Sequence, residues 1–138
     1  MSKVEFYETE VVAANGEAVR LVYERNEDIL EVFFAQNEPA TGVELTDHIL
    51  LRLNQHTGKA VSLTILHFSI LAERTEYGPR SYPLDNLDDL PEELQEVVMH
   101  IITTAPVNQF LKVSHFQASP TKRVPFTYVE SYHVDSVA

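Results

Sequence analysis

The chain has 138 residues and a formal net charge of −11 at pH 7, and because such a surface repels phosphates we expect no nucleic-acid partner. It contains no cysteine, which excludes disulfides and thiolate metal sites and fits a reducing compartment. No apolar run reaches the ~18 residues of a membrane span and no signal-peptide core follows Met1, so we expect a cytoplasmic protein without membrane contact.

Strand signals dominate the first half of the chain and return at its end. The length corresponds to about one domain, so we assign residues 1–138 to a single one. Within it, residues 1–71 are predicted as a β-meander, 72–90 as a long connection, 91–105 as a helix and 110–130 as C-terminal strands. The expected strands cover residues 4–12, 18–24, 28–34, 43–53, 61–71, 110–117 and 124–130.

An Asn-Gly pair at residues 15–16 predicts a β-hairpin at the start of the chain. Two registers are open. A two-residue turn would pair Val12 with Val19. A three-residue Ala-Asn-Gly loop would instead set Glu10 opposite Arg20, and we favour it because opposite charges across two strands attract each other.

Two long runs, 43–53 and 61–71, alternate between apolar and polar residues, which indicates that each buries one face in a sheet. For both buried faces to lie on the same side, paired residue numbers must sum to an even value. A three-residue loop that ends at a left-handed Gly58 meets this condition with a sum of 114. The resulting pairs are Leu53 with Val61, Leu51 with Leu63 and Ile49 with Ile65.

The next pair in this register is Asp47 with His67, two polar residues on the buried faces. A carboxylate that orients an imidazole is used in general-base catalysis and around bound metals. Two such residues at a sheet end can equally satisfy each other, because buried polar groups need partners. His115 shares a face with Leu111 and Val113 and would join the pair if the strands were adjacent. Asp47, His67 and His115 are therefore candidate catalytic residues, whereas no histidine spacing predicts a metal site and no glycine-rich loop predicts a cofactor.

An amphipathic helix is predicted within residues 91–105. Its apolar stripe consists of Leu94, Val97, Val98, Ile101 and Ile102. Pro91 and the neighbouring acidic residues suit its first turn, and Pro106 ends it. We therefore expect an α+β fold, an antiparallel β-meander of five to seven strands with one amphipathic helix packed on a face.

Residues 23–34 read Tyr-Glu-Arg-Asn-Glu-Asp-Ile-Leu-Glu-Val-Phe-Phe, and two alternating strands around a Thr-Gly-Lys turn follow them. Over about residues 20–70 this pattern resembles the bacterial family catalogued as domain of unknown function 2283. Two positions depart from the family pattern, Glu24 in place of Asp and Thr64 in place of Glu. Since the family has no assigned activity, the resemblance implies a fold and a bacterial class only.

No serine-nucleophile or phosphate-binding motif is present in the sequence. Apolar residues on the strand face opposite the main core need cover from the helix or from another subunit. These residues are Leu50, Leu66, Phe68 and Ile70. We therefore expect a non-enzymatic interaction or assembly module that forms homo-oligomers, with an unidentified protein as a further partner. The alternative is a small hydrolase or isomerase that uses Asp47 and His67, with His115 as a third member.

Overall fold

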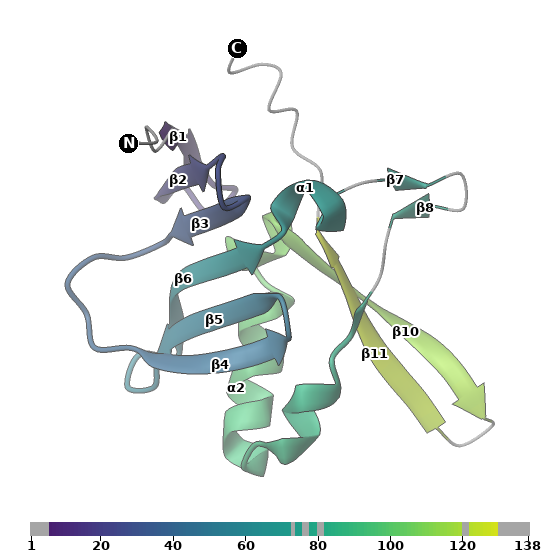
Figure 1. The fold of residues 1–138 in the computed structure, drawn as a ribbon. Helices are drawn as coiled ribbons and strands as arrows, with labels where there is room; N and C mark the ends of the chain where they lie inside the picture. Colours follow the sequence, from purple (N-terminus) through teal and green to yellow (C-terminus); the bar gives the residue numbers. More distant parts are fainter. Residues whose placement is uncertain (1–5, 73, 76–77, 80–81, 120–121, 130–138) are drawn as a thin grey trace.

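The structure is a computed structural model that describes residues 6–72, 74–75, 78–79, 82–119 and 122–129. A six-stranded antiparallel sheet and one main helix dominate it, and a three-stranded sheet near the C-terminus extends to one side (Figure 1). The predicted α+β class, with an antiparallel sheet and a single long helix, is therefore confirmed.

The elements follow one another from β1 to β11. The first strands are β1 (Phe6–Val12), β2 (Ala18–Glu24), β3 (Ile29–Phe33), β4 (Thr41–Thr46), β5 (Ile49–Asn54) and β6 (Lys59–Leu66). After them come α1 (Phe68–Leu71), β7 (Arg74–Thr75), β8 (Gly78–Pro79), β9 (Tyr82–Pro83), the 3₁₀ turn η1 (Asp85–Asp89) and α2 (Glu92–Ile102). The 3₁₀ turn η2 (Val107–Gln109), β10 (Leu111–Ser119) and β11 (Lys122–Val129) complete the described chain.

The main sheet has the strand order β1-β2-β3-β6-β5-β4. It consists of two three-stranded meanders, β1 to β3 and β4 to β6, which join where β3 pairs with β6. The loop of residues 34–40 carries the chain from β3 to the far edge, where β4 begins. Sequential strands thus pair within each half, and the two halves close into one sheet (Figure 1).

The first hairpin has the register that the charges favoured. Glu10 pairs with Arg20, and Val11 pairs with Val19. Gly16 adopts a φ of 85°, a left-handed conformation that a residue with a side chain rarely takes. Residues 4–5 of the expected first strand lie outside the described residues.

The run 43–53 is two strands rather than one. The chain reverses at Asp47 and His48, where the Thr46 hydroxyl accepts the His48 backbone N–H at 3.0 Å, and β4 folds back onto β5. Val43 pairs with Leu51, so a buried odd-numbered residue again faces a buried odd-numbered one. The alternation is therefore the same for a hairpin as for a continuous strand, and the pattern alone could not distinguish them.

The pairing of β5 with β6 largely follows the expected register. Ile49 faces Ile65 and Leu51 faces Leu63, and Gly58 is left-handed with a φ of 67°. The pair expected at Leu53 is wrong, because Leu53 faces Ala60 instead of Val61. Val61 bulges out of the pairing, and its carbonyl accepts the backbone N–H groups of Phe34 and Ala35.

Residues 61–71 were expected to form one strand, but the strand ends at Leu66 and a short helix follows it. His67 is left-handed with a φ of 55°, and α1 begins at Phe68. The backbone N–H of Phe68 donates to the Asp28 carbonyl at 3.0 Å, which holds the new direction. Phe68 was expected on the face opposite the core, but it is buried and packs edge-on against the Tyr23 ring.

Helix α2 lies across the face of the sheet on which Leu51, Leu63 and Ile65 are buried (Figure 1). Val98, Ile101 and Ile102 are buried in the same core, and Leu94 and Val97 are half-buried against it. The predicted apolar stripe is thus the side of α2 that packs against the core. The helix ends at Ile102, three residues before the expected end at 105. The hydroxyls of Thr103 and Thr104 donate to carbonyls of the last turn at 2.6 and 2.7 Å and so cap this end.

The long connection of residues 72–90 contains the short strands β7 to β9 and the turn η1. Strand β9 pairs with β11, and β11 pairs with β10, which makes a three-stranded sheet separate from the main one. Phe110 and Leu111, at the start of β10, are buried in the common core. No helix in the described part of the chain is long and apolar enough to cross a membrane.

Candidate functional site

The residues singled out from the sequence do not form the expected pair. Asp47 is exposed at the tip of the β4–β5 turn and has no hydrogen bond or ion pair with any described residue. His67 lies beyond the end of β6, where the backbone turns into α1. The expected Asp47–His67 contact is therefore not formed, because the turn at 47–48 removes Asp47 from the strand that faces β6.

The ring that meets His67 is that of His48. Their Nδ1 atoms lie 3.3 Å apart, and the two rings are nearly perpendicular at 83°. The His48 carbonyl accepts the N–H of Leu66 at 2.8 Å, which places His48 beside the residue that precedes His67. The Tyr82 ring centre lies 6.3 Å from that of His48. Sequence reasoning missed His48, because in a continuous strand it falls on the face opposite Ile49.

His115 lies on β10, where its backbone pairs with Pro125. Strand β10 belongs to the three-stranded sheet, where it pairs with β11 and with no other strand of the described residues. Strands β10 and β6 belong to different sheets, so they are not neighbours. The neighbouring strands that were expected to bring His115 beside His67 are therefore not found. Among the described residues, no group of three or more histidine, aspartate or glutamate side chains converges to hold a metal ion.

A cluster of hydrogen bonds around Asp28 lies close to the histidines. Asp28 occupies the β2–β3 turn with a φ of 58°. Its carboxylate accepts the Tyr23 hydroxyl at 2.6 Å, the Ser69 hydroxyl at 2.6 Å and the Ser69 backbone N–H at 3.0 Å. These bonds connect the β2–β3 turn to the beginning of α1.

The cluster shifts the pKa values of two groups. Burial raises the pKa of Tyr23 to about 12, and the hydrogen bond to Asp28 adds to the effect because it favours the protonated phenol. Burial alone would raise the pKa of Asp28. The hydrogen bonds from Ser69 and Tyr23, with the nearby His67 ring, outweigh burial and lower the pKa of Asp28 below its ordinary value. A carboxylate that accepts three hydrogen bonds is stabilised in its charged form, which makes Asp28 an anchor rather than a proton acceptor.

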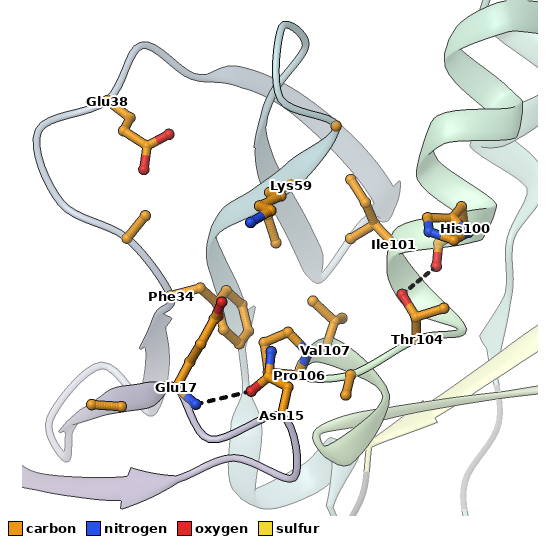
Figure 2. Close-up of a pocket in the computed structure, with 15 residues that line it drawn as sticks. Asn15, Glu17, Phe34, Glu38, Lys59, His100, Ile101, Thr104, Pro106 and Val107 are labelled. Atoms are coloured by element: carbon orange, nitrogen blue, oxygen red, sulfur yellow. Dashed lines mark hydrogen bonds between the residues drawn. The ribbon is translucent and has the colours of Figure 1, made fainter.

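A cleft of about 510 Å³ opens at the other end of the sheet, between the β1–β2 hairpin, the β3–β4 loop and the end of α2 (Figure 2). Phe34, Ile101 and Val107 contribute apolar surface to its wall. The polar residues that line it are Asn15, Glu17, Glu38, Lys59, His100 and Thr104. Its volume is within the range of small-ligand sites.

The charged groups of this cleft are not arranged as a catalytic set. Glu38 is held by a 3.0 Å hydrogen bond from the Asn54 side-chain amide. Lys59 reaches into the opening in Figure 2 and forms no ion pair with a described residue. No described pair of side chains in the cleft is joined as a nucleophile and a base, so the cleft has room for a ligand but suggests no reaction.

The face of the sheet opposite α2, termed the open face here, carries apolar side chains that the core does not use. They are Val22, Ile29, Phe33, Leu50 and Leu66, all half-buried. None of them belongs to the core or to the apolar residues packed against it, as far as the chain is described. In Figure 1, α2 passes behind β4 and β5, and no helix crosses in front of them.

Two neighbouring rows cross the open face at right angles to the strands. The arginine row consists of Glu10, Arg20, Phe33, Ser62 and Arg52, and the glutamate row consists of Glu8, Val22, Glu31, Thr64, Leu50 and Glu44. Arg20 stacks over the Phe33 ring at 4.5 Å and pairs with Glu8 at 3.1 Å. Arg52, Glu31 and Glu44 form no hydrogen bond or ion pair with any residue in the described ranges.

Comparisons with known proteins identify no relative. No family model matches the chain, and no curated protein and no solved structure matches it significantly. The resemblance of residues 20–70 to the family of domain of unknown function 2283 therefore stays a prediction.

Proposed function

We propose that this chain is a non-enzymatic assembly module that forms homo-oligomers through the open face of its six-stranded sheet. The observation that carries the proposal is the set of half-buried apolar side chains on that face, which are separate from the described core and leave part of their surface in water. Apolar surface gathered on one sheet face is typical of an interaction site, because its removal from water favours association.

The charge pattern favours a second copy of the same chain as the partner. A two-fold axis that runs between the two rows, parallel to them, would place the arginine row of one copy over the glutamate row of the other. Arg52 would then lie over the partner's β5, close to Glu44 on the adjacent strand, and Arg20 would lie close to Glu31. Such an arrangement supplies partners for Arg52, Glu31 and Glu44, whereas at the β1 edge Glu10 would face the partner's Glu8, so the charge complementarity lies in the rest of the face.

The proposal also includes a cytoplasmic location, which the absence of cysteine supports. A small hydrolase or isomerase has less support, because it requires Asp47 beside His67 and the turn at residues 47–48 separates them. The cleft between the first hairpin and α2 supports ligand binding by its volume alone, and no reaction is derived from it.

The experiment is a comparison of molar masses by size-exclusion chromatography with light scattering. Leu50→Lys places a cation opposite the partner's arginine row, so the variant should elute as a monomer while the parent chain elutes as a dimer. Leu50 is half-buried and lies outside the described core, so the fold should survive the change. Ile70→Lys is the matched control, because Ile70 is 50% exposed on α1 and outside both rows. A dimer that persists in Leu50→Lys, or that dissociates equally in Ile70→Lys, would contradict the proposed interface.

A further inference from the structure

The distance between the His48 and His67 rings differs from that of a strong hydrogen bond. Nitrogen donors in proteins usually approach an acceptor to about 2.9–3.0 Å, with 3.2 Å as the ordinary upper limit. The two Nδ1 atoms are 3.3 Å apart. A hydrogen bond between the two rings at this distance is long, so the contact leaves each nitrogen able to bind another partner.

The same distance fits two ligands of one metal ion. Zn²⁺ binds imidazole nitrogen at about 2.0–2.1 Å in a tetrahedral shell, which places two ligand nitrogens about 3.3–3.4 Å apart. The spacing of the two Nδ1 atoms falls at this value. The pair could therefore chelate an ion without moving its nitrogens apart or together.

The backbone on both sides of the pair is already ordered. His67 is held in a left-handed conformation by the hydrogen bonds that Asp28 accepts from Phe68 and Ser69. His48 is held in the β4–β5 turn by its bonds to Thr46 and Leu66. Because this backbone is held before an ion arrives, binding has to order the two side chains alone, which lowers its entropic cost. The charge of Asp28, close enough to His67 to interact with it, also favours a cation at this end of the sheet.

We propose that His48 and His67 form a two-imidazole chelate for a divalent transition-metal ion of the Zn²⁺ class, bound through both Nδ1 atoms. Water molecules complete the coordination shell, since no third histidine or carboxylate among the described residues converges there. Imidazole nitrogen selects Zn²⁺, Cu²⁺ or Ni²⁺ over Mg²⁺ and Ca²⁺, which prefer oxygen ligands. The site lies at the end of the sheet and includes no member of the two rows, so it does not depend on the proposed dimer.

Isothermal titration calorimetry of the full chain with ZnCl₂ at neutral pH tests this proposal, with MgCl₂ as the comparison ion. The parent chain should bind one Zn²⁺ and no Mg²⁺. His48→Gln and His67→Asn should each weaken Zn²⁺ binding roughly tenfold or more. Asn is chosen at position 67 because it tolerates a left-handed backbone better than other residues with side chains.

His56→Gln is the matched control, because His56 is exposed in the β5–β6 turn and away from the pair. It should bind Zn²⁺ as the parent does. Thermal melts without metal should be similar for the parent and all three variants, so that a loss of binding is not a loss of fold. Absence of Zn²⁺ binding by the parent, or binding by His48→Gln and His67→Asn as tight as that of the parent, would overturn the proposal.

Discussion

The Tyr23 hydroxyl donates a 2.6 Å hydrogen bond to the Asp28 carboxylate across the turn between β2 and β3. The same carboxylate accepts two hydrogen bonds from Ser69, so one side chain connects a turn of the first meander to α1. The connection holds the start of α1 just after β6 ends at Leu66. His67 lies between the two elements, where its ring meets that of His48.

Tyr23 should ionise later than an ordinary tyrosine. Its folded-state pKa is raised to about 12, above the ordinary value of 10. The stability that this shift contributes is fully present below about pH 10 and is lost as the pH rises towards 12. A spectrophotometric titration of phenolate absorbance should show a late-titrating tyrosine in the parent that is missing in Tyr23→Phe. If the two titration curves differ only by an ordinary tyrosine near pH 10, the hydrogen bond to Asp28 is not formed.

Asp28 should make the fold sensitive to acid. Its pKa is lowered in the folded state, so its contribution to stability is present above the ordinary carboxyl pKa and is lost as the pH falls through the lowered folded value. Urea midpoints measured between about pH 7 and pH 2 should fall below about pH 4 in the parent. In Asp28→Asn the midpoint should be lower at pH 7 and should fall less with acid. Equal pH dependence in both proteins would contradict the role assigned to this carboxylate.

Val98→Asp should prevent folding. Val98 is 0% exposed at the centre of the face that α2 packs on the sheet, and the variant would place a charge there without a partner. The expected cost is about 3–5 kcal/mol, a large fraction of the stability of a small domain. His100→Asp changes an exposed residue of the same helix and is the control. Circular dichroism should show a cooperative thermal transition for His100→Asp and none for Val98→Asp.

Local patterns predicted much of the fold. The register of the first hairpin followed from Glu10 and Arg20, and the pairing of Ile49 with Ile65 followed from alternation and a left-handed Gly58. The stripe of α2 followed from helical spacing. In each case the information lies within a few residues or in a repeat of two or 3.6, which is why it can be read from the chain.

The candidate sites depended on contacts that no local pattern contains. A hairpin at Asp47 and a straight strand bury the same residues, so alternation could not show that His48, rather than Asp47, meets His67. Ser69 binds Asp28 across 41 positions of sequence, and this bond forms only because α1 replaces the end of a strand. Such pairs are determined by tertiary packing rather than by sequence spacing.

Sedimentation equilibrium of the parent chain at micromolar concentrations tests self-association through the open face. Near physiological ionic strength, where repulsion between distant like charges is largely screened, two copies should associate. The expected mass is twice the chain mass of 15.7 kDa, with dissociation on dilution. A mass of 15.7 kDa across the whole concentration range would contradict it.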